Sequence, residues 1–490
     1  MMGDVFLLPS GTRSNIPLAT NGFAPRIGLA YSLTSKTLVR GGYGILWIPN
    51  DVSFALNPIN DMVNAPGTTF TGTVDGTHPF SSISLPFPDG ISPPPGRSLG
   101  TAGTQQFLTQ VVQSITEVNR FHHPEGYVQQ WNLNIERQVP AGFLLSAAYV
   151  GSKGTHLAQY SQQTNQISDA LLSQAAAQFA AGGTTAVTLV QSVPNPFFVN
   201  GKALALGAPT TTAGQLLRPY PQYTSVELAG QGSFASIYHS LQITAQRRFA
   251  EAGSLLVAYT NSKLISNTDT LTSWLETGVG ALQDNNNLRN ERSLSSQDVP
   301  QRLVISYVLD LPFGQGKRYL STVSQTWNRM IDGWGIDGVT TFQRGFPLVF
   351  SNGQANDATL FGAGSRPNVV TGCEKTSSSA RSRVNGWFNT PCFAAPADFT
   401  FGSEPRVDAT LRSDGVINSD FAIFKKVVFG ADGRTGMEAR VEFFNLFNRT
   451  QFAPPNTTCC TANNANFGFV TSTAPGTNPR LIQFALKFFF

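Results

Sequence analysis

The chain has 490 residues, of which only 13% are charged and 11% are aromatic, and its net charge is +4. Typical soluble chains carry about 25% charged residues, and no block of basic residues appears, so nothing indicates nucleic-acid binding. No stretch approaches the roughly 18 consecutive apolar residues of a membrane helix, which excludes an α-helical span but leaves a β-barrel open.

The chain begins with MMGDVFLLPSGTRSN, a short apolar run with no basic segment before it. A secretory signal needs a basic start and a longer apolar region, so this stretch is not one. We expect either a protein that is not exported or a chain that begins inside a longer one. Residues 1–22 are predicted as a residual loop or a partial strand.

Period-two alternation predicts the strands. In RIGLAYSL, Ile27, Leu29, Tyr31 and Leu33 alternate with small or polar residues, and TLVRGGYGILW repeats the pattern after a tight turn. Alternate side chains of a strand point to opposite faces, so this hairpin has one apolar face. Further strands are predicted in YVQQWNLNIER, FLLSAAYVG, SLQITAQRR, SLLVAYTNS, RLVISYVLD, WGIDGVTTF, INSDFAIFKKVVF, TGMEARVEFF and LIQFALKFFF, which makes eleven in all.

The connections between these strands alternate in length. Short turns or a moderate connection join the members of each hairpin, and long loops at about 48–126, 152–235, 265–300, 346–415 and 448–478 join one hairpin to the next. Short turns on one side and long loops on the other are typical of an outer-membrane barrel, with the long loops outside the cell. A soluble sandwich has no reason to segregate its loops in this way.

Aromatic residues on the apolar face support the same interpretation, because barrels carry aromatic girdles at both membrane interfaces. They are Tyr31, Trp47, Tyr127, Tyr149, Tyr259, Tyr307 and Trp334. The predicted fold class is therefore all-β, a transmembrane antiparallel β-barrel with long extracellular loops. A soluble β protein remains the alternative, since alternation alone does not separate the two.

The predicted number of strands is odd, whereas single-chain bacterial barrels usually have an even number. With the last strand running toward the periplasmic end, alternation makes RIGLAYSL run the same way. We therefore expect at least one strand to be missing at the front, because an open edge in lipid is not allowed.

Few residues of the sequence suggest a catalytic or ligand-binding site. His122, His123 and Glu125 lie together before a strand and could bind a metal, although a loop at the rim is the favoured interpretation. Gly41 to Leu46 (GGYGIL) lacks the helix and the Lys-Ser/Thr pair of a phosphate loop, and its glycines sit inside a strand.

Three charged side chains, Glu438, Arg440 and Glu442, share one strand face and are predicted to line the lumen and satisfy one another. The stretch DNNNLRNERS (Asp284 to Ser293) is expected to be a solvated external loop, with sugar or peptide binding at its tip as the alternative. No catalytic motif is found, and no cofactor or metal is expected.

The four cysteines have no zinc-binding spacing. Cys373 and Cys392 could form a disulfide across a polar loop in an oxidising compartment, or remain free thiols. Cys459 and Cys460 are adjacent, and a bridge between neighbours needs strained geometry.

An ordered set of stretches resembles the C-terminal barrel region of Oar-like TonB-dependent transporters, and it covers nearly the whole chain apart from the loops. The stretches are FAPRIGLAY, LVRGGYGILW, QQWNLNIERQ, AAYVGSKGTHL, RPYPQY, YHSLQITAQRRF, AYTNSKL, VPQRLVISYVLDLPFGQGK, WFNTPCF, ARVEFFNLFNRTQF and PRLIQFALKFFF. The resemblance implies a 22-stranded barrel in the bacterial outer membrane, of which residues 23–490 would be about half.

The family also has an N-terminal sandwich, a plug and a TonB-contacting segment, for which there is no room before Phe23. TonB is therefore expected as a partner only if a plug and a TonB box lie upstream. The resemblance implies uptake of an unidentified ligand without catalysis. The alternatives are a structural or adhesive surface barrel and a soluble carbohydrate-binding module.

The chain ends in LIQFALKFFF, with a terminal phenylalanine. Ile482, Phe484, Leu486, Phe488 and Phe490 alternate with polar or small residues and are predicted to face outer-membrane lipid. Phe484, Leu486, Phe488 and Phe490 resemble the C-terminal signal that barrel-assembly machinery recognises, which makes that machinery an expected partner.

Overall fold

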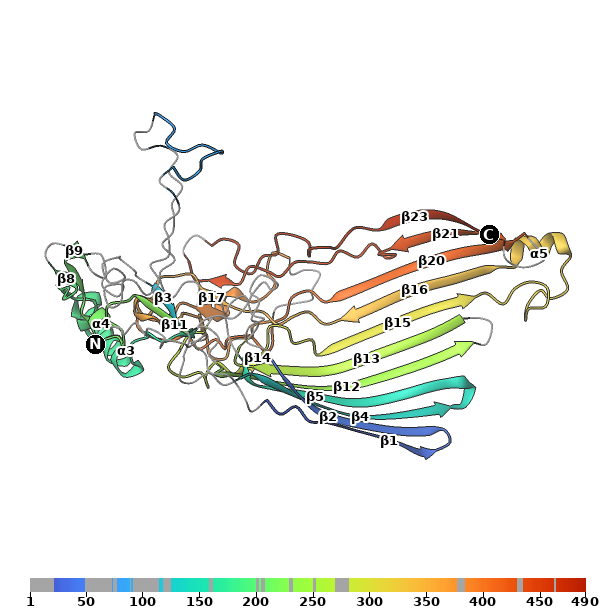
Figure 1. Cartoon of the computed structure of the whole chain (residues 1–490), viewed down its shortest axis with the longest axis horizontal. Coiled ribbons are helices and arrows are strands. Elements are labelled where there is room, and N and C mark those ends of the chain that lie inside the picture. The colour runs from blue at the N-terminus through green and yellow to red at the C-terminus, as the bar shows by residue number, and fades with distance from the viewer. Residues whose placement is uncertain are drawn as a thin grey trace.

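A long antiparallel sheet dominates the computed structural model of the chain, with its connections gathered at the two ends (Figure 1). The residues that the structure describes are 22–48, 73, 77–88, 90, 114–117, 125–157, 162–199, 202–203, 208–228, 232–249, 253–268, 282–376, 384–429, 435–461 and 464–490. Residues 1–21, which fall in the predicted residual loop, lie outside them.

All eleven predicted strands are confirmed, and they pair in chain order. They are β1 (Arg26–Thr34), β2 (Thr37–Trp47), β4 (Tyr127–Val139), β5 (Phe143–Leu157), β12 (Phe234–Phe249), β13 (Gly253–Ser266), β15 (Gln301–Asp310), β16 (Trp334–Gln343), β20 (Val416–Val428), β21 (Gly436–Phe444) and β23 (Leu481–Phe489). The short strand β14 (Ser293–Leu294) pairs with β13 beside this path.

The register separates the side chains into two faces. Ile243 lies opposite Ala147 and Tyr259, whereas its neighbour Thr244 lies opposite Ser146 and Ala258. Directly opposed residues share a face in an antiparallel pair. We name the face of Ile243 the outer face and the face of Thr244 the polar face.

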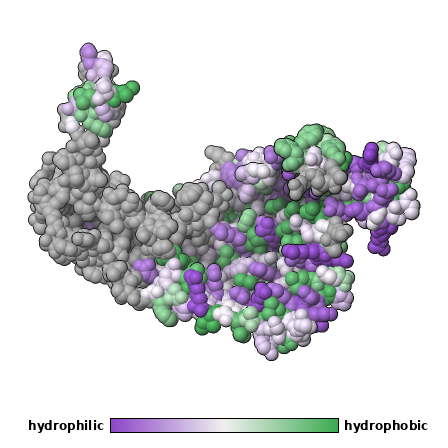
Figure 2. Space-filling model, turned by 45° about the vertical axis from the view of Figure 1, so that its right-hand side comes forward, coloured by the Kyte–Doolittle hydropathy of each residue, from purple (hydrophilic) through white to green (hydrophobic). Residues whose placement is uncertain are grey.

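The outer face carries the predicted apolar set, including all seven girdle aromatics and the apolar residues of the C-terminal strand. Hydrophobic side chains reach the surface over the strand region (Figure 2). In water this exposure would be unfavourable, but a hydrocarbon neighbour removes the cost.

Glycines in the strands make room for rings from the neighbouring strand. A Cβ on Gly151 would collide with the indole of Trp131, and one on Gly335 would collide with the ring of Phe424. Gly335 is on the polar face, where Phe424 is buried. Glycine inside a strand often marks such a close approach.

The short-turn end carries the hairpin turns, such as Ser35 and Lys36 between β1 and β2, and the helix α5 (Gln325–Ile331) between β15 and β16. The C-terminus lies at this end (Figure 1). Both β1 and β23 run toward it, as the sequence predicts.

The long-loop end contains the other elements of secondary structure. They are the helices α3 (Asp169–Gly182) and α4 (Ala213–Leu216), the 3-10 turns η4 (Thr184–Ala186), η5 (Thr188–Val190), η6 (Asp357–Phe361) and η8 (Thr390–Cys392), and the small strands β3 (Ser114–Glu117), β6 (Gln162–Gln163), β7 (Ser192–Pro194), β8 (Phe198–Val199), β9 (Lys202–Ala203), β10 (Thr210–Thr212), β11 (Ser225–Leu228), β17 (Ser351–Asn352), β18 (Asn368–Val369), β19 (Phe393–Ala394) and β22 (Thr458–Cys459). The turn η3 (Pro140–Gly142) joins β4 to β5 at the opposite end. Among the described residues, no helix is both long and apolar enough to span a membrane.

Two buried hydrophobic clusters lie in these loops. One is built around Ile167, Leu172 and Phe361, and the other around Phe350 and Trp387. We name the described parts of loops 162–228, 282–300, 346–415 and 448–478 the loop cap. Its apolar residues pack against one another, so the cap is a folded layer with its own core.

The sheet does not close among the described residues. β1 pairs with β2 alone, and β23 pairs with β21 alone. The residues of β1 are exposed along its whole length. The expected missing strand stays a prediction, and these two edges are where further strands would pair.

Placing an arginine in the middle of the outer face tests which face meets lipid. We expect Ile243→Arg to destabilise the inserted sheet by about 2–4 kcal/mol, the cost of an arginine at the bilayer midplane. Thr244→Arg, one residue along on the polar face, is the matched control and should cost much less. The measurement is the amount of heat-modifiable protein in outer-membrane fractions, and equal losses for the two variants would refute the assignment of faces.

Candidate functional site

A charged cluster lies on the polar face across β16 and β21. The guanidinium of Arg440 lies 2.8 Å from Asp337 Oδ2, 3.4 Å from Glu438 Oε1 and 3.1 Å from Glu442 Oε1. Asp337 and Glu442 both lie opposite Ala422 of β20, so the sheet itself brings them together.

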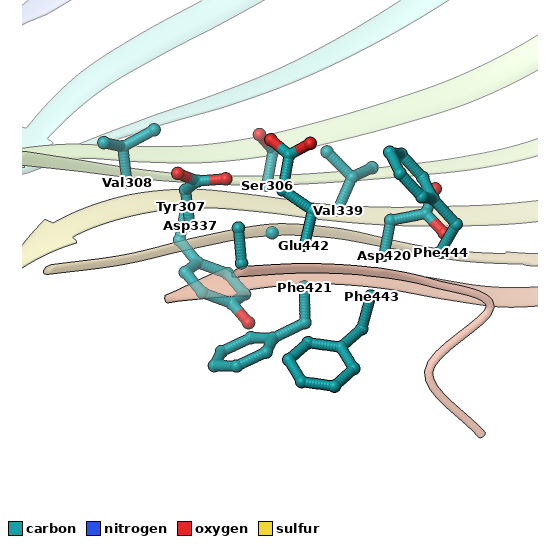
Figure 3. A pocket seen from close by; sticks show the side chains of 12 residues that line it. Ser306, Tyr307, Val308, Asp337, Val339, Asp420, Phe421, Glu442, Phe443 and Phe444 are labelled. Atoms are coloured by element: carbon teal, nitrogen blue, oxygen red, sulfur yellow. The ribbon is translucent and has the colours of Figure 1, made fainter. Parts of the chain in front are cut away.

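The surroundings of this cluster show the alternation of the sheet directly. Asp337 and Glu442 project to one side, while Tyr307, Phe421 and Phe443 project to the other (Figure 3). The guanidinium of Arg440 holds the three carboxylates together by pairing with each of them. The geometry agrees with the prediction that Glu438, Arg440 and Glu442 line the lumen.

A second polar cluster is buried in the loop cap around Glu291, which is 0% exposed. Its Oε1 accepts hydrogen bonds from the backbone N–H of Gln283 at 3.1 Å and of Asp284 at 3.2 Å. Its Oε2 pairs with the guanidinium of Arg366. A buried carboxylate is tolerated only when it is paired and hydrogen-bonded in this way.

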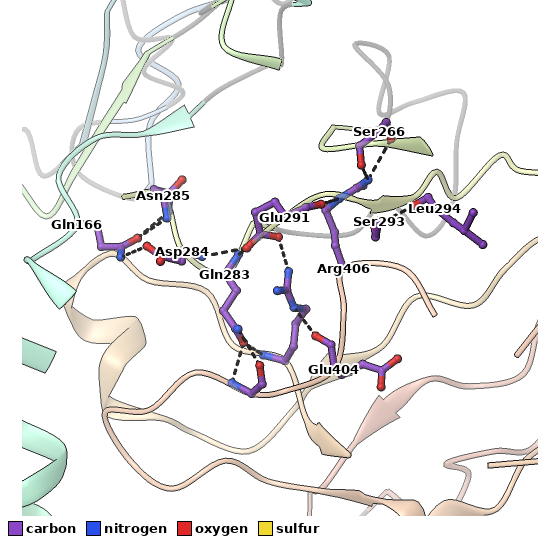
Figure 4. A network of polar contacts seen from close by, with 12 residues as sticks. Gln166, Ser266, Gln283, Asp284, Asn285, Glu291, Ser293, Leu294, Glu404 and Arg406 are labelled. Atoms are coloured by element: carbon purple, nitrogen blue, oxygen red, sulfur yellow. Dashed lines mark hydrogen bonds and ion pairs between the residues drawn. The ribbon is translucent and has the colours of Figure 1, made fainter. Parts of the chain in front are cut away.

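Arg406 extends this cluster to the main sheet. Its guanidinium, also 0% exposed, donates to the Glu291 carbonyl and to the carbonyl and hydroxyl of Ser266, each at 3.0 Å (Figure 4). Ser266 is the last residue of β13. One buried arginine therefore joins two distant loops and the end of a strand.

The expectation of a solvated external loop at residues 284–293 holds only in part, since Asn286, Arg289, Asn290 and Arg292 are exposed whereas Asp284 and Glu291 are buried. Asp284 is 4% exposed and accepts from the side chain of Gln166 at 2.9 Å, and Asn286 donates to the Ile167 carbonyl at 2.9 Å. Burial raises the pKa of Asp284. Asp284, Asn285, Asn286 and Glu291 link segments inside the cap, which sequence alternation cannot show for an irregular segment.

A third polar cluster contains one lysine and two carboxylates. Lys375 Nζ lies 2.8 Å from Glu404 Oε2 and also pairs with Asp408. Burial raises the pKa of the Glu404 carboxyl to about 8, and the neighbouring Asp408 adds to this shift while Lys375 opposes it. Burial alone would raise the pKa of Asp408, but hydrogen bonds with Glu404 and Lys375 lower it.

A disulfide lies beside this third cluster. The structure pairs Cys373 with Cys392, whose Cα atoms are 5.4 Å apart, and it also pairs the adjacent Cys459 with Cys460. Cys392 and Cys459 both belong to the hydrophobic cluster around Phe350. The first bridge holds the segment that carries Lys375 against the cap core.

The remaining predicted site residues are placed as follows. His122 and His123 lie outside the described residues, whereas Glu125 lies just before β4. The glycines of GGYGIL are inside β2, as the sequence predicts. Within the part of the chain that the structure describes, no group of three or more His, Cys, Asp or Glu side chains is arranged to hold a metal.

Arg366 and Arg406 were not recognised from the sequence as structural residues. The available signal was weak: both stand in a chain with few charges, inside segments otherwise rich in small and polar residues. A charged residue in such a loop usually contacts solvent, so only the fold reveals that these two are buried.

The fold and polar face define the wall of a membrane β-barrel, and sequence comparison agrees. A family model described as an outer membrane beta barrel domain matches residues 3–483, so the chain belongs to this family. The protein is accordingly located in the bacterial outer membrane. No curated protein matches the chain in sequence.

Solved structures of outer-membrane proteins match the chain at low sequence identity and with low TM-scores. The outer membrane transporter YddB from Escherichia coli is 8% identical with a TM-score of 0.43, and the match covers 94% of this chain and 40% of that one. The pyoverdine outer membrane receptor FpvA from Pseudomonas aeruginosa PAO1 is 10% identical with a TM-score of 0.38, covering 95% and 36%. The ferric citrate transporter FecA is 9% identical with a TM-score of 0.35, covering 95% and 38%. The chain thus spans well under half the length of each of these proteins.

Removing the buried carboxylate of Glu291 should destabilise the cap. We expect Glu291→Ala to cost about 3–5 kcal/mol, because it leaves Arg366 as an uncompensated buried charge. Glu374→Ala is the control, since Glu374 is exposed in the same layer and should cost under about 0.5 kcal/mol. Limited proteolysis of the purified protein reports on cap unfolding, and similar cleavage rates in both variants would contradict the assignment.

The shifted pKa of Glu404 predicts a pH dependence of cap stability. Its folded pKa of about 8 lies above the ordinary value of 4.5, so the folded cap binds the proton more tightly than the unfolded chain. The contribution of Glu404 to the free energy of unfolding of the cap is therefore fully present below pH 4.5. It falls as the pH rises toward 8, by up to about 1.4 kcal/mol per pH unit.

Comparing wild type with Glu404→Gln across this pH window isolates the contribution of Glu404. The glutamine cannot lose a proton, so proteolytic resistance of the variant should lose most of this dependence. Asp408 does not confound the comparison, because its lowered pKa moves its titration below 3.8. An unchanged pH profile in the variant would show that Glu404 is not protonated in the folded cap.

Proposed function

We propose that the chain is the C-terminal part of a TonB-dependent receptor barrel of the Oar-like type, which takes up an unidentified ligand across the outer membrane. The observation that carries the proposal is the eleven-stranded sheet with an apolar outer face and two unpaired edges. The ordered motifs that resemble Oar-like transporters support it, since most of them occur in these same strands, and RPYPQY and WFNTPCF lie in the loop cap.

The unpaired edges support a complete barrel that is larger than the described sheet. β1 and β23 each leave one row of backbone N–H and C=O groups without partners in the sheet, which hydrocarbon does not permit. Further strands must therefore pair with both edges, and a barrel of about 22 strands, as in the Oar-like family, would supply them. In such a barrel residues 23–490 form about half of the wall.

The polar clusters take different parts in this function. The Arg440 cluster faces the lumen, where a plug would sit, and the loop cap lies at the end where the long loops of a barrel face the exterior. Ligand capture is assigned to the cap and entry to the lumen, with no chemistry by the barrel itself. TonB supplies the energy only where a plug and a TonB box precede these strands.

Assembly of the barrel is assigned to the last strand. Phe484, Leu486 and Phe488 lie on the outer face of β23. With Phe490 they form the pattern proposed for recognition by barrel-assembly machinery. Outer-membrane lipid then covers the same apolar residues once the strand has inserted.

Uptake measurements in three strains test the proposal. Wild type, a strain lacking this gene and a strain lacking TonB are supplied with a panel of labelled iron chelates, cobalamin, oligosaccharides and peptides. We expect uptake of at least one compound to fall about tenfold or more in both mutants. Normal uptake of the whole panel without the gene, together with weaker attachment of cells to surfaces, would instead support a structural or adhesive barrel.

A further inference from the structure

The charges on the strands of the main sheet are divided unequally between its two faces. By register, every carboxylate of these strands is on the polar face: Glu136, Asp310, Asp337, Asp420, Glu438 and Glu442. The charged residues of the outer face are all cations: Arg137, Lys153, Arg247, Lys263 and Lys425. In the described strands, the outer face is therefore purely basic where it is charged.

The outer-face cations occupy two levels. Arg137, Arg247 and Lys425 lie near the short-turn end, and Lys153 and Lys263 lie near the long-loop end. Along β12, the outer face has three residues between the level near the long-loop end and the level near the short-turn end. They are Leu241, Ile243 and Ala245. The long loops of a barrel face the exterior, so Lys153 and Lys263 lie at the outer-leaflet interface.

His239 lies between the two lysines on the outer face. Its cross-strand partner on β13 is Lys263. Its cross-strand partner on β5 is Gly151, which lies two residues before Lys153. Two strand spacings of roughly 5 Å and a two-residue offset of roughly 7 Å place the lysine Cα atoms about 12 Å apart. Both lysines and His239 are exposed.

Aromatic residues fix the imidazole between these lysines. Tyr149 Oη lies 2.7 Å from His239 Nδ1, and the two rings stack with centroids 6.0 Å apart. The indole of Trp131 lies 6.1 Å from the same imidazole and crosses Gly151, where a Cβ would collide with it. The bond to Tyr149 occupies Nδ1, which leaves Nε2 of His239 available to a ligand.

The two lysines form no ion pair with any carboxylate among the described residues. Their ammonium groups thus supply uncompensated positive charge at the membrane surface, where a bound anion is favoured. The apolar side chains of Leu241 and Ile243 lie directly below, toward the membrane centre, and suit acyl chains. Cations above and apolar residues below match a phosphorylated lipid.

We propose that Lys153, His239 and Lys263 bind the phosphate groups of the phosphorylated glycolipid that forms the outer leaflet of the bacterial outer membrane. The site lies near the long-loop end of the strands, so the lipid that it binds belongs to the outer leaflet. The distance between the two lysines suits a headgroup with more than one phosphate. Tyr149 and Trp131 hold the imidazole and border the sugar region. The bound lipid would be a fixed component of the outer surface of the barrel, separate from ligand uptake through the lumen.

Native mass spectrometry of the purified outer-membrane protein in detergent tests this site. The protein is titrated with diphosphoryl lipid A, with enzymatically dephosphorylated lipid A and with phosphatidylglycerol. We expect diphosphoryl lipid A to bind wild type at least tenfold more tightly than either of the other two lipids. The double variant Lys153→Gln/Lys263→Gln should lose most of this preference.

The matched control removes two cations from the polar face instead. Arg248→Gln/Lys487→Gln carries the same change of net charge and should retain the affinity of wild type for diphosphoryl lipid A. Equal loss in this control would show a general effect of charge and overturn the proposal. Heat-modifiable mobility checks that each variant is folded.

The wild-type comparison of lipids tests the proposal even if a variant fails to fold. Equal binding of lipid A with and without phosphate would overturn a phosphate site. Equal binding of phosphatidylglycerol would overturn the assignment to the outer-leaflet glycolipid. Retained tight binding by a folded Lys153→Gln/Lys263→Gln variant would show that these residues are not the site.

Discussion

Backbone hydrogen bonding in hydrocarbon is the constraint on which the rest of this structure depends. A segment that crosses a membrane must satisfy each N–H and C=O inside the protein, because no water is available there. Here the constraint is met by strand pairing in chain order from β1 to β23. Among the described strands of the main sheet, β1 and β23 each pair on one side alone.

Lipid contact also changes where the buried core of the protein lies. Acyl chains of an outer membrane can cover the side chains of the outer face, and Ile243 and Phe484 are exposed in the described sheet. The well-packed cores lie instead in the loop cap, around Phe361 and Phe350. The membrane wall and the cap thus obey opposite rules of burial within one chain.

Electrostatics follows the same division into environments. On the polar face, Arg440 is shared by three carboxylates, whereas in the cap the buried carboxylate of Glu291 is paired with Arg366. On the outer face the strands carry cations alone, near the levels where lipid headgroups would lie. Each arrangement places a charge where its surroundings stabilise it.

Alternation in the sequence was sufficient to predict all eleven strands, their faces and the direction of β23, because side-chain period in a strand depends only on local geometry. The position of Glu438, Arg440 and Glu442 on one polar face followed from the same rule. The cap could not be predicted in this way. Its segments have no period, and its contacts join residues more than a hundred positions apart, such as Gln166 with Asn285.

The sequence by itself therefore determined the class of protein and the sidedness of every strand, because a membrane wall repeats one local pattern. Only the tertiary structure decided that Asp284 and Glu291 are buried, that Arg406 joins two loops to β13, and that Lys153 and Lys263 flank His239 on the outer face. These features depend on register and on long-range packing. Both properties arise only when distant parts of the chain are brought together in space.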